Sequence, residues 1–139
     1  MELPPWNFRG SKIVSIKKFM KNGKMVICFD VDDTLIVPSV ATGLDMDTPN
    51  YETIAVYKWF QKQGAYMIVW SGGGMDWART WADKLGLKPD EIRVKEKSED
   101  IDICFDDCIV DLAKVNIRVQ RFKNSVSRKD WNENKNETQ

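Results

Sequence analysis

The sequence predicts an α/β fold in which one domain is built around a central, mostly parallel sheet. Three observations predict it. Short, continuous apolar runs recur along the chain, as is typical of strands that are buried on both faces of a parallel sheet. Amphipathic segments with recognisable helix ends lie between these runs, which is the alternation expected of βαβ units. The length of 139 residues suits a single compact domain.

The apolar runs give the expected strands. Residues 24–29 read KMVICF, residues 65–70 read AYMIVW, and residues 101–105 read IDICF. We expect a fourth strand at 115–119 and a weaker fifth at 92–94. Each run is too short for a buried helix, so a strand is the better interpretation.

Two helices are expected between the strands. The first would begin at Pro49, which suits the first helical position after Thr48, and would end at Gly64. The second would cover 76–85 and end at Gly86, with tryptophans spaced four residues apart on one face.

The core of the single domain is expected at 24–120. Residues 1–23 form an N-terminal extension, and residues 123–139 form a polar tail that we expect to be flexible. Residues 11–24 fit either an amphipathic helix or a strand joined to the next one by an Asn22-Gly23 turn.

The composition restricts the chemistry that is available. The chain has no histidine, which excludes Ser-His-Asp triads, Cys-His pairs and histidine metal sites. The three cysteines fit neither a zinc pattern nor a disulfide framework, and we expect Cys28 and Cys104 to be buried thiols in a reducing cytoplasm. No apolar run is long enough for a membrane span. Catalysis would therefore depend on carboxylates, hydroxyls, lysine and a metal ion.

Charge is distributed unevenly although the chain has 21 basic and 21 acidic residues. The two ends are basic and the middle, residues 25–111, is acidic. An acidic middle suits a site that binds a divalent cation. The basic residues near the C-terminal end could contact a nucleic-acid backbone or could only increase solubility.

Three expected strands end at residues that can bind a phosphate or a metal. The first ends at Asp30 and is followed by Asp32. The second ends at Ser71, which precedes three glycines, and the third ends at Asp106. In an open parallel sheet, ligands bind beyond the carboxyl ends of the strands, so these side chains should meet.

These residues suffice for phosphoryl transfer. Asp30 can attack phosphorus as a nucleophile, and Asp32 can protonate the leaving oxygen and then activate water. Asp106 and Asp30 can share Mg²⁺, which offsets the repulsion between clustered carboxylates and a phosphate dianion. Ser71 and the amides of Gly72 and Gly73 can bind the phosphoryl oxygens.

Four ordered segments carry a resemblance to a known family. FDVDDTL at 29–35, MIVWS at 67–71, a lysine at 95 or 97, and DICFDD at 102–107 resemble the four motifs of the haloacid dehalogenase superfamily. The resemblance implies a Rossmann-like, three-layer domain and a phosphatase that acts through an aspartyl-phosphate. It also implies that the backbone carbonyl of Asp32 binds Mg²⁺.

The same resemblance leaves several assignments open. For the site lysine we favour Lys97 over Lys95, because Ser98 follows it as in the usual pattern. Asp107 could bind the metal through water or only orient the site, whereas Asp33 is better explained as a turn residue. Trp77 is expected to be a core or shielding residue, with stacking on a nucleobase as the alternative.

The segments 36–70 and 72–96 each hold too few residues for a cap domain, so the site should be open. By the resemblance to this superfamily, an open site implies a large substrate or a partner subunit that covers the pocket. The sequence therefore predicts a Mg²⁺-dependent phosphomonoester hydrolase, with a nucleotide or nucleic-acid end phosphatase as one alternative. A binding module that keeps the fold but turns over weakly is the other. The sequence does not indicate the oligomeric state.

Overall fold

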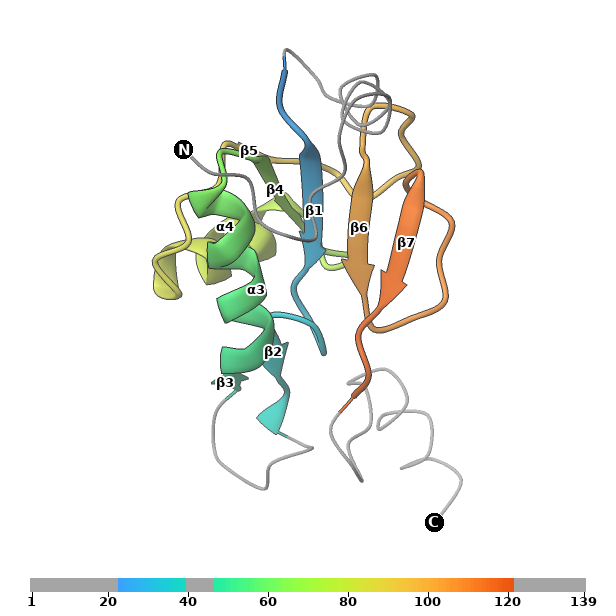
Figure 1. The fold of residues 1–139 in the computed structure, drawn as a ribbon. Coiled ribbons are helices and arrows are strands. Elements are labelled where there is room, and N and C mark those ends of the chain that lie inside the picture. The colour runs from blue at the N-terminus through green and yellow to red at the C-terminus, as the bar shows by residue number, and fades with distance from the viewer. Residues whose placement is uncertain (1–22, 40–46, 122–139) are drawn as a thin grey trace.

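The structure is a computed structural model, and it describes residues 23–39 and 47–121 (Figure 1). The expected N-terminal extension up to residue 22 and the expected polar tail at 123–139 lie outside these residues. So does most of the segment 11–24, whose two interpretations stay open.

The centre of the fold is a five-stranded sheet in the order β5-β4-β1-β6-β7 (Figure 1). Its strands are β1 (Val26–Asp30), β4 (Tyr66–Trp70), β5 (Glu91–Ile92), β6 (Ile103–Asp106) and β7 (Val115–Arg118). Every neighbouring pair is parallel. The prediction of an α/β fold with a mostly parallel central sheet is therefore confirmed, and all five expected runs contribute to it.

Two helices, α3 (Tyr51–Lys62) and α4 (Met75–Lys84), connect the strands on one side of β1. The predicted start of the first helix was wrong. Asn50 is the N-cap, and its side chain accepts a hydrogen bond from the backbone N–H of Thr53 at 3.4 Å. Pro49 instead belongs to a short strand, where proline is tolerated at a sheet edge.

Both helices end as the glycines predict. Gly64 and Gly86 have φ values of 87° and 64°, in the left-handed region that glycine adopts without strain. Each follows the C-cap residue of its helix, Gln63 or Leu85. The chain can therefore turn sharply back into the sheet.

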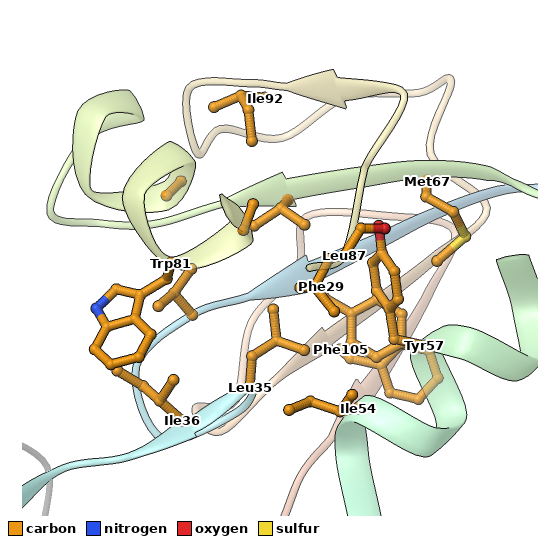
Figure 2. Packing of buried hydrophobic residues seen from close by; sticks show 14 of the residues in the cluster. Phe29, Leu35, Ile36, Ile54, Tyr57, Met67, Trp81, Leu87, Ile92 and Phe105 are labelled. Atoms are coloured by element: carbon orange, nitrogen blue, oxygen red, sulfur yellow. The ribbon is translucent and has the colours of Figure 1, made fainter. Parts of the chain in front are cut away.

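The core has one cluster on each face of the sheet. Figure 2 shows the larger cluster, in which alternate strand residues such as Phe29 and Phe105 pack with Tyr57 of α3 and Trp81 of α4. The rings of Phe29 and Phe105 stack with centroids 4.4 Å apart. Burying aromatic and aliphatic side chains in this way supplies most of the stabilisation and fixes the strand ends relative to one another.

The opposite face has a smaller cluster that includes Val26, Cys28, Ile68, Trp70 and Cys104. Both Cys28 and Cys104 are free and buried, as expected. No described helix contributes to this cluster, so the described residues show the sheet and one layer of helices. The predicted third layer remains a prediction.

A small antiparallel pair lies next to the carboxyl end of β1. It consists of β2 (Ile36–Val37) and β3 (Thr48–Pro49), with Ile36 opposite Pro49. The sequence patterns did not predict it, because two-residue strands leave no periodicity. Among the helices of the described residues, none combines the length and apolar character that crossing a bilayer requires.

Candidate functional site

Three neighbouring strands end at one edge of the sheet with polar residues. Asp30 is the last residue of β1, Asp106 is the last residue of β6, and Ser71 directly follows β4. The register pairs Phe29 with Phe105, so Asp30 and Asp106 lie level on adjacent strands. All three residues are buried, so this edge of the sheet carries polar groups that are largely shielded from water.

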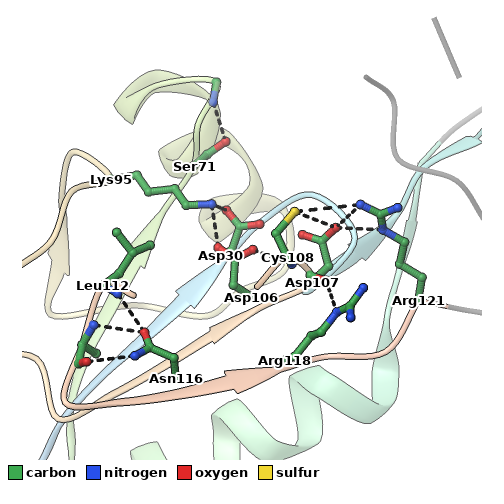
Figure 3. Close-up of polar contacts among 12 residues, drawn as sticks. Asp30, Ser71, Lys95, Asp106, Asp107, Cys108, Leu112, Asn116, Arg118 and Arg121 are labelled. Atoms are coloured by element: carbon green, nitrogen blue, oxygen red, sulfur yellow. Dashed lines mark hydrogen bonds and ion pairs between the residues drawn. The ribbon is translucent and has the colours of Figure 1, made fainter. Parts of the chain in front are cut away.

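Lys95 lies between the two carboxylates (Figure 3). Its Nζ is 3.2 Å from Oδ1 of Asp30 and 2.6 Å from Oδ2 of Asp106. The Lys95 side chain is 23% exposed, whereas those of Asp30 and Asp106 are 6% and 0% exposed. One cation therefore balances two acids that are withdrawn from water.

The electrostatics of this group are unusual. Burial and the Asp106 carboxylate raise the pKa of Asp30 to about 8, although Lys95 opposes the shift. Burial alone would lower the pKa of Lys95, but Asp30 and Asp106 raise it, so the ammonium stays charged. Among the described residues, both carboxyl groups contact the Lys95 ammonium, so ionisation of Asp30 places two negative charges beside one positive charge.

The position of the site lysine differs from the prediction. Lys97 is 64% exposed, and its ammonium pairs with the exposed Asp111 at 2.9 Å. It is Lys95 that lies among the site carboxylates. Ser98 was the reason that the sequence favoured Lys97 as the site lysine. Its hydroxyl instead donates a hydrogen bond to Asp100 in the turn before β6.

Arg93 explains why the segment after β5 presents Lys95. Its guanidinium is bonded to Glu91 at 2.6 Å and to Asp100 at 2.9 Å. These ion pairs connect the end of β5 to the turn that precedes β6. Lys95 lies in the sequence between Arg93 and Asp100, the two residues of the longer ion pair. Proximity to the strand end was the signal in the sequence that could have identified Lys95.

Asp32 lies in a tight turn beyond β1. The carbonyl of Val31 accepts hydrogen bonds from the N–H groups of Thr34, Leu35 and Ile36. Asp33 is buried in this turn with φ of 61°, which confirms its interpretation as a turn residue. The turn brings the Asp32 carboxylate to the indole N–H of Trp77, which donates to Oδ2 at 3.1 Å.

The glycine loop connects β4 to α4. The Gly73 N–H donates to Oγ of Ser71 at 2.9 Å, and the Gly74 N–H donates to the Ser71 carbonyl at 3.1 Å. Gly74 is the N-cap of α4, with φ of 105°. Gly72 and Gly73 are exposed. The loop thus lies at a helix N-terminus, where backbone N–H groups and the helix dipole favour anions.

Asp107 is held from the side of β7. Arg121 contacts its carboxylate at 2.8 Å, and the Nε of Arg118 donates to its backbone carbonyl at 3.1 Å (Figure 3). Burial raises the pKa of Asp107, whereas Arg121 opposes the shift. This ion pair gives Asp107 a partner that the sequence did not reveal. Arg118 lies opposite Asp106 in the register of β6 and β7.

Potential metal donors are concentrated at the end of β6. Oxygen and sulfur atoms of Asp106, Asp107 and Cys108 lie within 4.8 Å of one another. Oδ1 of Asp106 accepts a hydrogen bond from the Cys108 N–H at 2.9 Å. Of these donors, the carboxylate oxygens suit a hard cation and the thiol does not.

Comparisons of this chain with protein-family models, with curated proteins and with solved structures find no match.

Proposed function

We propose that the protein is a Mg²⁺-dependent phosphomonoester hydrolase that forms an aspartyl-phosphate on Asp30. The observation that carries the proposal is the ammonium of Lys95 between Asp30 and Asp106, at 3.2 and 2.6 Å from their oxygens. Carboxylates that converge on a cation at the ends of adjacent parallel strands suit phosphoryl transfer, which needs a nucleophile and groups that balance the charge on the phosphoryl oxygens. The ordered resemblance to the haloacid dehalogenase motifs supports the same function.

The donor set fits magnesium. Asp30 and Asp106 present buried carboxylates at the same level of the sheet edge, and hard oxygen ligands are what Mg²⁺ prefers. In the resemblance, the backbone carbonyl of Asp32 is a further ligand. When bound, Mg²⁺ would neutralise charge on the phosphoryl group and on the carboxylates.

The chemistry of the chain itself has two steps. In the first, an Asp30 carboxylate oxygen attacks phosphorus, the bond from phosphorus to the ester oxygen breaks, and Asp32 gives its proton to that oxygen. In the second, Asp32 takes a proton from water as the water oxygen attacks phosphorus. Phosphate leaves, and the Asp30 carboxylate is restored.

Two groups would hold the phosphoryl oxygens in both steps. The Lys95 ammonium can offset charge on the nucleophile and on the phosphoryl group, so we assign to Lys95 the role first given to Lys97. Ser71 and the amides of Gly72 and Gly73 can donate hydrogen bonds at the N-terminus of α4. The Gly73 N–H bonds to Ser71 in this structure, so binding of phosphate would exchange that hydrogen bond for another.

We further propose a Rossmann-like domain without a cap, in the cytoplasm. The connections between the strands support the absence of a cap, since 51–62 and 75–84 are single helices that pack on the sheet. An open site would take its specificity from contacts outside the phosphate pocket, so the substrate would be larger than a sugar phosphate. Arg118 and Arg121 beside the site favour a nucleotide or a nucleic-acid end.

A matched set of variants tests the proposal. Hydrolysis of a generic aryl phosphate is measured for wild type, for Asp30→Asn and for Asp111→Asn, each with Mg²⁺ and with excess chelator. Asp111 is an exposed acid that pairs with Lys97, so its variant controls for a lost carboxylate. We expect wild type and Asp111→Asn to be active with Mg²⁺ and inactive with chelator. Asp30→Asn should be inactive under both conditions. Activity that survives chelation would contradict the metal's role, and an inactive wild type would favour a binding module.

A further inference from the structure

Trp77 joins the two loops that carry the proposed acid and the proposed phosphate site. It lies in the first turn of α4, and its indole N–H donates to Oδ2 of Asp32 at 3.1 Å, across 45 positions of sequence. The same ring lies against Gly73, where an added Cβ would be 3.4 Å from Cδ1 of Trp77 and 3.3 Å from Oγ of Ser71. The added Cβ would crowd Oγ of Ser71 but make only ordinary contact with the indole, so the ring lies at van der Waals distance from the glycine loop.

The surroundings of Trp77 hold the ring in place. Its ring packs edge-to-face on Trp81, with centroids 6.1 Å apart, and it packs against the larger core cluster. A side chain fixed by packing keeps the direction of its N–H, and so it can fix the carboxylate that accepts from it. Rotation of the Asp32 carboxylate would break this hydrogen bond.

We propose that Trp77 is a positioning residue that fixes the orientation of the Asp32 carboxylate beside the glycine loop. This inference rests on the proposed function. An indole N–H donates only, so it requires a lone pair on Oδ2. The hydrogen bond therefore holds Oδ2 toward the first turn of α4. Trp77 thus keeps the Asp32 carboxylate in one orientation, in place of two interchangeable ones.

The test compares Trp77→Phe with Trp81→Phe. Phenylalanine keeps an aromatic ring in each place and removes the indole N–H. Trp81 is the matched control, since its buried Nε1 has no hydrogen-bond partner among the described residues. The assay uses an alkyl phosphate, whose leaving oxygen needs a proton, and an aryl phosphate with a good leaving group, which needs none.

We expect Trp77→Phe to lower kcat on the alkyl phosphate by about ten- to a hundredfold, as for loss of one hydrogen bond to a charged group. KM on that substrate should change by less than about threefold, because ground-state binding does not use the proton. The kcat on the aryl phosphate should also change by less than about threefold, because its leaving group departs without a proton. Trp81→Phe keeps an aromatic ring for Trp77 to pack on, so any loss should be smaller than in Trp77→Phe and equal on the two substrates. In an Asp32→Ala background, Trp77→Phe should cause no further loss. Equal losses on both substrates with Trp77→Phe would overturn the inference.

A spectroscopic readout reports the contact independently of turnover. The indole ¹H–¹⁵N resonance of Trp77 should shift in Asp32→Ala, and that of Trp81 should not. An unshifted Trp77 resonance would overturn the inference even if the kinetics agreed. A wild type that hydrolyses neither substrate would contradict the proposed function itself. An active wild type with equal losses in Trp77→Phe would contradict only the inference about Trp77.

Discussion

The ammonium of Lys95, on the segment that follows β5, lies 2.6 Å from the fully buried Asp106 at the end of β6. This contact places Lys95 among the carboxylates of the proposed site, whereas Lys97, two residues later, belongs to an exposed ion pair. The geometry favours Lys95, whereas the pattern in the sequence favoured Lys97.

Replacement of Lys95 tests that separation. We expect Lys95→Gln to lower kcat by about a hundredfold or more, because a positioned charge in a water-poor site contributes far more than an exposed one. Lys97→Gln is the matched control and should keep nearly full activity. Steady-state kinetics on an aryl phosphate measure both. Equal effects of the two substitutions would contradict the assignment.

The raised pKa of Asp30 predicts a pH-dependent stability. Because the pKa is near 8 in the folded protein and 3.8 is its ordinary value, the folded state binds a proton that the unfolded chain releases. The free energy of unfolding of the metal-free protein should therefore fall as pH rises from about 4 to about 8. Asp30→Asn removes this titration and should be more stable than wild type at pH 8.5.

The measurement is Tm by circular dichroism, in chelator, at pH 8.5 and at pH 5. We expect Tm of Asp30→Asn to exceed that of wild type by at least about 4 °C at pH 8.5, and by less at pH 5. Asp111→Asn, an exposed control, should show no such difference between the two pH values. A gap between Asp30→Asn and wild type that is the same at both pH values would argue against the raised pKa.

Asp32 should affect substrates according to their leaving groups. Asp32→Ala should lower kcat on alkyl phosphates by about a hundred- to ten-thousandfold, since the leaving oxygen then departs without a proton. Loss on an aryl phosphate with a good leaving group should be much smaller. The slope of log kcat against leaving-group pKa measures the difference. If the slope does not change from that of wild type, Asp32 is not the general acid.

The size of the substrate is tested by catalytic efficiency on three compounds. We expect a 3′- or 5′-phosphorylated oligonucleotide and a mononucleotide to be preferred over a hexose phosphate, with the oligonucleotide losing its advantage at moderate salt. Arg118→Gln should reduce that advantage, because Arg118 lies opposite Asp106 beside the site. Lys88→Gln, which removes a charge before β5, is the control. A preference for the hexose phosphate without a salt effect would rule out the nucleic-acid alternative.

Much of the sheet could be predicted because its strands are buried on both faces and read as continuous apolar runs. Examples are residues 26–30 and 66–70. Both runs are apolar because they lie in the core, and the one charged residue in them is Asp30 at the end of the first run. The positions of Asp30, Ser71 and Asp106 followed from the same reasoning. Strand ends are where a parallel sheet presents functional groups.

The remaining features depend on contacts between distant segments. The helix start at Tyr51 follows from pairing of Pro49 with Ile36, which no local pattern contains. The choice of Lys95 depends on ion pairs of Arg93, and the Trp77 hydrogen bond depends on how α4 packs beside the turn after β1. Such tertiary contacts overrule local propensity and spacing.

The most direct test of the account is detection of phosphate bonded to Asp30. The protein is incubated with Mg²⁺ and a rapidly cleaved aryl phosphate, quenched in acid, digested and analysed by mass spectrometry; Asp30→Asn serves as the control. We predict a mass increase of one phosphoryl group on the peptide that contains Asp30, absent from the variant and from a sample with chelator. Turnover by the wild type without this adduct, together with substantial turnover by Asp30→Asn, would contradict the covalent route.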